Sequence, residues 1–263
     1  MSKRPRDPEA TRDRLAAWID DRVRESGTEG AVFGLSGGVD SAVVCGLCAR
    51  ALGPGRCLGL ILPIESAGDD ARLAREAAAT FGVQAVEVAL GDAFERLLGA
   101  LEAAAREAGR GAHQVAGDPR GEDPRLARMN LKPRLRMASL YYFANSLNRL
   151  VVGTGNAAEL AVGYFTKHGD GGADIFPLGD LVKGEVLDLA RTLGVPAEIV
   201  DRPPSAGLAP GQTDEAELGM AYAELDAFLL EGTTGDDALD DRIRALGRAS
   251  RHKVEPAPVA RSD

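Results

Sequence analysis

The sequence has few of the residues that mark secreted, membrane or nucleic-acid-binding proteins. Only three of its 263 residues are cysteines, an odd number that argues against a secreted disulfide framework. No apolar run reaches the roughly 18 residues needed to span a bilayer, and residues 1–14 are too charged for a signal peptide. Basic residues are not in excess, because 31 Lys and Arg against 40 Asp and Glu give a net charge of −9. These absences predict a cytoplasmic protein that binds neither membrane nor nucleic acid.

Apolar and charged residues are present in the proportions of an ordinary folded protein. Hydrophobic residues make up 44% of the chain and charged residues 27%, which excludes bulk disorder. Glycine is abundant: 32 residues are about 12% of the chain, against a usual ~7%. Much of the backbone must therefore turn sharply or approach another group closely.

Short apolar runs alternate with segments of helical periodicity. Leu15, Trp18, Ile19 and Val23 fall on one face of a helix, and a buried strand is expected at 31–35. Further strands are expected at 57–62, 83–89 and 150–153, and helices at 39–52, 69–81 and 92–108, with another ending at 147. This alternation predicts a single-domain α/β fold, a parallel sheet with helices on both faces. Segments 109–124 and 163–180 are expected to be loops, and 256–263 a flexible tail.

A glycine-rich loop, Ser36-Gly37-Gly38-Val39-Asp40-Ser41, lies where the first strand meets the next helix. Paired glycines let a ligand approach the backbone, and the N–H groups of the following helix favour a phosphate. No Gly-Lys-Ser/Thr follows, so this is not a Walker A loop, and the phosphate charge must be balanced elsewhere. The alternative is a glycine-rich turn with a serine at the helix N-cap.

Two carboxylates could hold Mg²⁺ next to this loop. Asp40 lies within it, and Glu159 follows the fourth strand; residues at the carboxyl ends of parallel strands converge on the ligand crevice. The alternatives are that Asp40 only supports the helix start and that Glu159 is a solvated helix-face residue. Cys45 and Cys48 lie three apart on one helix with no second pair at zinc-like spacing, so a packed helix face is favoured.

The motifs together carry a resemblance to a known family. The loop at 36–41 resembles the pyrophosphate-binding loop of the N-type ATP pyrophosphatases, and residues 152–174 resemble the long signature of the ammonia-dependent NAD synthetases. Similarity continues at 130–136, 177–178, Lys183, 204–208, 212–219 and 252–253, and covers roughly residues 10 to 255. The resemblance implies one NAD synthetase domain over 1–255, with a Rossmann-like fold of the adenine nucleotide alpha hydrolase type.

The resemblance also implies a ligase activity, EC 6.3.1.5. ATP would adenylate the nicotinate carboxylate of deamido-NAD, and ammonia would displace AMP to give NAD, with pyrophosphate as the other product. Such catalysis depends on positioning and charge stabilisation by Mg²⁺, basic side chains and backbone N–H groups. The family further implies a homodimer with the dinucleotide site at the interface.

Carried over residue by residue, the family pattern assigns roles to these positions. Asp40, Lys183 and Asp174 are the catalytic candidates, and Asp40 and Glu159 the Mg²⁺ ligands. ATP would be held by Gly34, Leu35, Ser36, Gly37, Gly38, Val39, Asp40, Ser41, Thr154, Lys183 and Ser205. Deamido-NAD would be held by Arg134, Lys167, Asp174, His252 and Lys253.

Two positions depart from the family pattern. Family members often have an arginine that reaches ATP where this chain has Ile61, and some have a histidine at Asn156. Other interpretations also stay open. Lys183 taken alone could be a surface lysine near a helix start. The chain could also be a tRNA-thiolating or GMP-synthesising pyrophosphatase, or a regulatory module that holds ATP without turnover.

Overall fold

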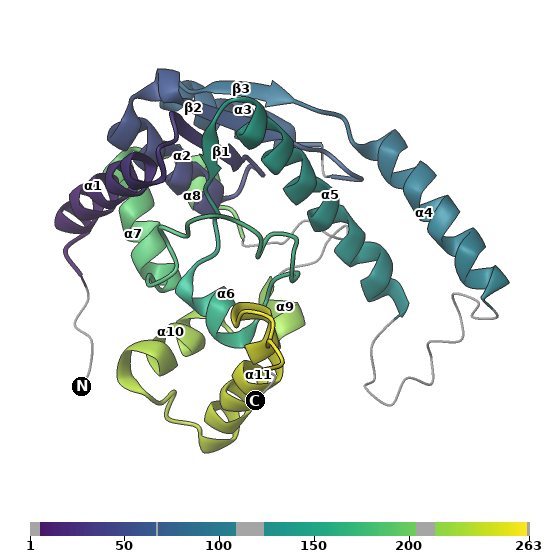
Figure 1. Ribbon diagram of the computed structural model, residues 1–263. Coiled ribbons are helices and arrows are strands. Elements are labelled where there is room, and N and C mark those ends of the chain that lie inside the picture. The colour runs from purple at the N-terminus through teal and green to yellow at the C-terminus, as the bar shows by residue number, and fades with distance from the viewer. Residues whose placement is uncertain (1–5, 67, 109–123, 204–213, 262–263) are drawn as a thin grey trace.

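A computed structural model describes residues 6–66, 68–108, 124–203 and 214–261. Its strands β1 (Gly30–Gly34), β2 (Cys57–Ile61), β3 (Gln84–Glu87) and β4 (Arg149–Val151) form one parallel sheet. The strand order is β3-β2-β1-β4, so the chain moves outward from β1 to β3 and then crosses to the other side of β1 (Figure 1). The predicted α/β fold with a parallel sheet is confirmed.

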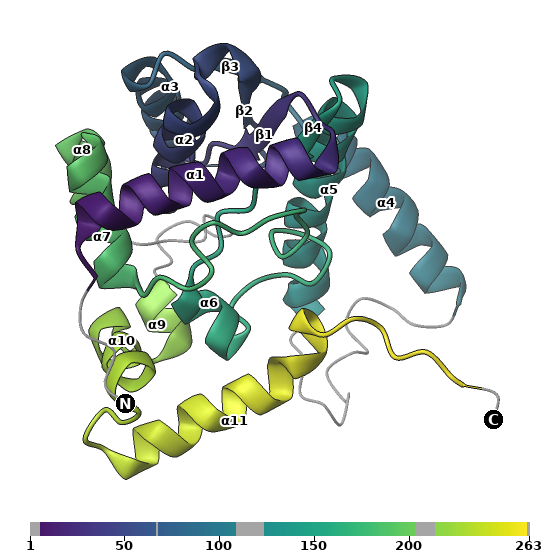
Figure 2. The same cartoon turned by 60° about the vertical axis from the view of Figure 1, so that its left-hand side comes forward.

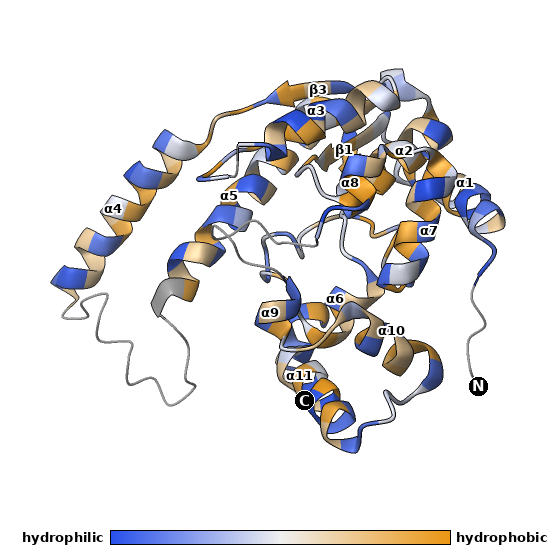
Figure 3. Ribbon diagram, turned by 180° about the vertical axis from the view of Figure 1, so that it is seen from behind, coloured by the Kyte–Doolittle hydropathy of each residue, from blue (hydrophilic) through white to orange (hydrophobic). Residues whose placement is uncertain are grey.

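Side chains of the central strands alternate between two apolar layers. Ala31 and Phe33 pack in the larger cluster with helices α1 (Pro8–Ser26), α2 (Val39–Leu52) and α7 (Lys183–Leu193). Val32, between them, packs instead with Leu58 and with the side chains of helix α5 (Pro124–Ser146). Because both faces are covered, β1 and β2 are continuous apolar runs, as parallel strands usually are. In Figure 3 the sheet is largely hydrophobic, whereas α4 and α5 alternate between hydrophobic and hydrophilic residues.

A second, smaller cluster lies beyond the carboxyl ends of the strands. It contains Ala158, Val162, Leu218, Leu225 and Ile243. The helices of this part of the chain are α6 (Ala157–Val162), α9 (Asp214–Leu218), α10 (Tyr222–Glu231) and α11 (Asp237–Val254). Figures 1 and 2 show them as a separate layer that faces the sheet edge. The other elements are η1 (Pro54–Arg56), α3 (Asp70–Thr80), α4 (Gly91–Glu107) and α8 (Ala197–Val200).

Most local predictions hold, with differences at the element ends. Helix α5 extends back to Pro124 although Pro133 lies inside it, so only its final turns were identified from the sequence. Residues 163–180 contain no helix or named strand, as expected, but Ile175 forms a single β-bridge with Val152. Segment 109–123 lies outside the described residues. No helix in the described ranges is both long and apolar enough to cross a bilayer.

The cysteines are part of the core, as predicted. Cys45 and Cys48 on α2 and Cys57 on β2 are buried and free. Burial raises the pKa of Cys45 to about 12 and that of Cys57 to about 11. These thiols therefore stay protonated and pack as small apolar side chains.

Candidate active site

A cleft of about 1350 Å³ lies at the carboxyl ends of β1 and β4. This is the point where the strand order reverses, which is where open α/β sheets bind ligands. The volume exceeds the ~300–1,000 Å³ of a typical small-molecule pocket. The predicted residues that line it are Gly34, Leu35, Ser36, Gly38, Val39, Asp40, Ser41, Arg134, Thr154, Glu159, Lys167, Lys183, His252 and Lys253.

The glycine-rich loop is held in shape by its own hydrogen bonds. Ser41 Oγ donates to the carbonyl of Gly38 at 2.8 Å and accepts from the N–H of Ser36 at 3.3 Å. Gly37 has φ of +81°, and a Cβ added there would lie 2.5 Å from the carbonyl oxygen of Asp70. Gly38 is the N-cap of α2 and makes no side-chain cap bond, so the interpretation as a turn with an N-cap serine is wrong. The first N–H groups of α2 have no side-chain cap and suit an anion.

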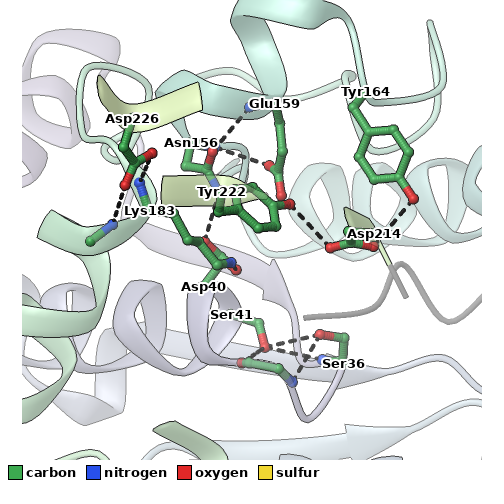
Figure 4. Close-up of polar contacts among 12 residues, drawn as sticks. Ser36, Asp40, Ser41, Asn156, Glu159, Tyr164, Lys183, Asp214, Tyr222 and Asp226 are labelled. Carbon is green, nitrogen blue, oxygen red and sulfur yellow. Dashed lines mark hydrogen bonds and ion pairs between the residues drawn. The ribbon is translucent and has the colours of Figure 1, made fainter. Parts of the chain in front are cut away.

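Asp40 is held by two residues from distant parts of the chain (Figure 4). Lys183 Nζ lies 2.5 Å from Asp40 Oδ2, and Asn156 Nδ2 donates to Asp40 Oδ1 at 3.0 Å. The Lys183 side chain is 4% exposed and that of Asp40 19%, so Lys183 is not a surface lysine. Burial lowers the pKa of Lys183, but the charges of Asp40 and Glu159 outweigh this and raise it. Lys183 is therefore a buried cation beside the glycine-rich loop.

Glu159 faces the cleft instead of the solvent. Its Oε2 accepts from the N–H of Asn156 at 3.1 Å, and its own N–H donates to Asn156 Oδ1 at 3.1 Å, a capping box at the start of α6. Burial, together with the charge of Asp40, raises the pKa of Glu159 to about 8. Asn156 thus contacts both carboxylates, and the interpretation of Glu159 as a solvated helix-face residue is wrong.

Other polar residues behind Lys183 were not identified from the sequence. Lys183 Nζ lies 5.2 Å from the centre of the Tyr222 ring. Both Tyr222 and Tyr164 donate to Asp214, at 3.1 and 3.2 Å (Figure 4). Asp226 accepts from the N–H of Lys183 at 3.0 Å and so caps the start of α7 from a neighbouring helix. Asp214 belongs to the 212–219 stretch that carried the resemblance, whereas nothing in the local pattern marked Asp226.

The predicted dinucleotide residues other than Asp174 form a connected group in the same cleft. Arg134 Nε donates to the carbonyl of Lys167 at 3.2 Å, and Lys167 Nζ donates to the carbonyl of His252. Lys253 Nζ donates to the carbonyls of Gly163 and Phe165, at 2.7 and 2.9 Å. Helix α5, the 163–180 segment and the end of α11 therefore bring four predicted residues together.

Two of the predicted positions that the structure describes, Asp174 and Gly37, do not line the cleft. Asp174 is exposed; its carboxylate accepts from Tyr141 at 3.0 Å and from the N–H of Val151 at 2.8 Å, outside the cleft lining. Gly37 lies in the loop but is not part of the cleft lining, and a Cβ there would meet the backbone of Asp70. Ser205 lies outside the described residues. Ile61, at the departure from the family pattern, is buried in the larger core cluster.

The donor set fits a magnesium ion. Asp40 and Glu159 offer carboxylate oxygens, and Mg²⁺ is usually held by one or two protein carboxylates with substrate phosphates and water completing its shell. Among the described residues no group of three or more His, Cys, Asp or Glu side chains could form a full metal cage. A cation here would also offset the burial and the charge of Asp40, which together raise the pKa of Glu159.

A family model described as NAD synthase matches residues 11–256. The chain belongs to the NAD synthase family. This confirms the resemblance stated from the sequence and excludes the tRNA-thiolating and GMP-synthesising alternatives. As a member of the NAD synthase family, the protein is an enzyme of the ligase class.

Individual relatives cover nearly the whole chain. The NH(3)-dependent NAD(+) synthetase of Archaeoglobus fulgidus is 45% identical over 254 residues, 95% of each protein. The solved NMN synthetase of Francisella tularensis has a TM-score of 0.85 and 35% identity, covering 97% of this chain and 99% of that one. The NAD+ synthetase of Burkholderia pseudomallei has a TM-score of 0.73 and 31% identity, covering 94% and 90%.

Proposed function

We propose that this NAD synthase family member uses ATP to amidate deamido-NAD with ammonia, giving NAD, AMP and pyrophosphate. The main support for this proposal is that one cleft contains both the glycine-rich loop with Lys183 and the group of Arg134, Lys167 and Lys253. The first part suits a triphosphate, and the second offers cations for a dinucleotide with two phosphates and a carboxylate. Relatives at up to 45% identity carry the name of an ammonia-dependent NAD synthetase.

The reaction proceeds in two steps. A carboxylate oxygen of the nicotinate attacks the α-phosphorus of ATP, and the bond to the β-phosphate breaks to release pyrophosphate. The resulting acyl-adenylate has AMP as its leaving group; ammonia attacks the carbonyl carbon, loses a proton and gives the amide. The N–H groups of the loop and the ammonium of Lys183 would stabilise the phosphate charge during the first step.

Asp40 and Glu159 would hold Mg²⁺ at the ATP phosphates, supplying charge neutralisation there. The use of two carboxylates argues against a module that only stores ATP, since storage needs no second carboxylate at the phosphates. The two carboxylates are already held in place, because Asn156 forms hydrogen bonds to both Asp40 and Glu159.

Replacing Glu159 with glutamine should raise the Mg²⁺ concentration needed for half-maximal activity by about tenfold or more. Glutamine keeps an oxygen that can accept from the N–H of Asn156, so the capping box survives and only the charge is lost. Activity titrated against Mg²⁺ measures this. Glu185→Gln is the matched control, because Glu185 forms the equivalent bond to Val182 in α7 and does not line the cleft. An unchanged Mg²⁺ requirement in Glu159→Gln would contradict the metal assignment.

A second candidate substrate is nicotinate mononucleotide, favoured by the structural similarity to the NMN synthetase of Francisella tularensis. One assay decides between the two. The protein is incubated with ATP, Mg²⁺ and ammonium, with deamido-NAD or nicotinate mononucleotide as acceptor, and product, AMP and pyrophosphate are quantified. We expect efficient NAD formation and little NMN. Absence of NAD above background would refute the proposed function. Preferential NMN formation would show that the substrate is nicotinate mononucleotide instead of deamido-NAD.

We also propose a cytoplasmic homodimer in which residues 1–255 form the synthetase domain and the dinucleotide site lies at the interface. The edge strand β4 supports this, since Asp174 beside it is exposed. Tyr142 on α5 and Leu147, directly after α5, are also 70% and 41% exposed. Light scattering should therefore give a mass near twice 27.5 kDa. A monomer at assay concentration would argue against the shared site.

A further inference from the structure

Arg136 is a charged side chain in the cleft to which the proposed reaction assigns no role. It lies on α5, two residues beyond Arg134, and lines the cleft. Its Nε donates to the carbonyl of Leu62 at 3.0 Å, and an Nη lies 3.5 Å from Ser66 Oγ. Leu62 directly follows β2.

This position puts Arg136 next to the glycine-rich loop. Leu60, two residues before Leu62, is the register partner of Gly34, and its carbonyl accepts from the N–H of Leu35 at 2.8 Å. The guanidinium is thus held at the same sheet edge from which the loop departs. Burial lowers the pKa of Arg136, while the charges of Asp170 and Asp70 oppose that shift. Asp70 lies against Gly37, so Arg136 is within electrostatic reach of the loop side of the cleft.

Among the described residues, no carboxylate forms an ion pair with Arg136. Two other cations of the cleft are paired with carboxylates, Lys183 with Asp40 and Arg202 with Asp70. In the part of the chain that the structure describes, Arg136 has no carboxylate oxygen within 4 Å, and Nη1 forms no hydrogen bond. Arg136 Nη1 is also accessible to solvent. Among the described residues, the only side-chain polar atom that is both buried and without a partner is Arg22 Nε, so an unbonded Nη1 cannot be buried. A half-buried guanidinium with an open donor suits a planar or tetrahedral oxyanion.

We propose that Arg136 binds an oxyanion of the bound nucleotide at the loop side of the cleft. The ligand chemistry is a phosphate or carboxylate group, which either ATP or the pyridine nucleotide can supply. The proposal rests on the proposed function only in taking these nucleotides as the ligands. Arg136 would supply positive charge at the carboxyl end of β2, where the strand residues that line the cleft, Leu60 and Ile61, are apolar.

Calorimetric titration of the wild type and of Arg136→Gln, with ATP plus Mg²⁺ and separately with deamido-NAD, tests this. We expect the Kd of one nucleotide to rise roughly 10- to 100-fold, the cost of a lost charge-assisted hydrogen bond. Weaker ATP binding would assign the triphosphate as the source of the oxyanion, and weaker deamido-NAD binding would assign the pyridine nucleotide. Kd values for both nucleotides within twofold of the wild type would overturn the proposal.

Arg56→Gln is the matched control. Arg56 Nε donates to the carbonyl of Glu29 at 2.7 Å, so it also links a guanidinium to a backbone carbonyl, but at the amino end of the strands and outside the cleft. Its nucleotide affinities should stay unchanged. If Arg136→Gln fails to fold, Arg136→Lys is used to test the proposal instead. Lysine keeps the charge but cannot form a bidentate contact, so this variant should bind one nucleotide about three- to tenfold more weakly. Unchanged affinity in that variant would also overturn the proposal. A wild type that makes no NAD would refute the proposed function without affecting this comparison of affinities.

Discussion

Replacing Asp40 with asparagine should reduce kcat/KM for NAD formation by about 10³-fold or more. Asparagine keeps the shape of the side chain and an oxygen, but it removes the negative charge that would bind Mg²⁺ and that pairs with Lys183 at 2.5 Å. Pyrophosphate release from ATP measures the adenylation step directly. Near-normal pyrophosphate release from Asp40→Asn would contradict the metal assignment.

The fold should survive this change better than it would survive Asp40→Ala. Alanine would leave the ammonium of Lys183, 4% exposed, without its hydrogen-bond acceptor, and an unsatisfied buried polar group costs about 1–3 kcal/mol or more. Asp240→Asn is a suitable control. Asp240 is a buried aspartate on α11 that accepts from the N–H of Thr234 at 2.7 Å and does not line the cleft. The Asp240→Asn variant should therefore be less stable than the wild type but have an unchanged kcat.

Replacing Lys183 with methionine should reduce kcat/KM by roughly 10²- to 10³-fold. Lys183 is the buried cation beside the loop, and the loop lacks the lysine that a Walker A motif would place on the phosphates. Methionine preserves most of the side-chain volume over the Tyr222 ring, so the loss would come from the missing charge. Steady-state kinetics with varied ATP measure the effect.

Lys132→Met separates a charge effect on catalysis from a charge effect on folding. Lys132 is also 4% exposed, its Nζ lies 2.7 Å from Glu65 Oε2, and it lies 5.8 Å from the centre of the Phe94 ring, but it does not line the cleft. Both lysine variants should unfold at a lower temperature than the wild type. Only Lys183→Met should lose most of its activity; an equal loss in Lys132→Met would mean that the activity effect reflects instability.

Local patterns were sufficient to predict the elements that carry the loop. The apolar run at 31–35 followed by Ser-Gly-Gly identified β1 and the loop, because a parallel strand is apolar on both faces and glycine permits the φ of +81° at Gly37. Helix α5 was only partly identified, because Pro133 normally ends a helix and here lies inside one. Local propensity could not reveal that tertiary packing maintains the helix around it.

The arrangement of the charges in the cleft could not be predicted in the same way. Asp40 and Lys183 are 143 positions apart, and neither residue has a local pattern that identifies the other as its partner. Asn156 looked like a mere departure from the family pattern, yet it bonds to both Asp40 and Glu159. Arg136 belongs to the 130–136 stretch that carried the resemblance, but no role was assigned to it, because the sequence does not show its contact with Leu62.

The sequence by itself determined the fold class, the absence of a disulfide framework, the glycine-rich loop and the family, because each depends on residue type and on spacing along the chain. The tertiary structure decided which charges are paired. It buried Lys183 against Asp40, separated Asp174 from the cleft and left Arg136 without a carboxylate partner in the described residues. Those outcomes depend on how strands, loops and helices distant in sequence pack at one sheet edge, where burial and neighbouring charges set the strength of every interaction.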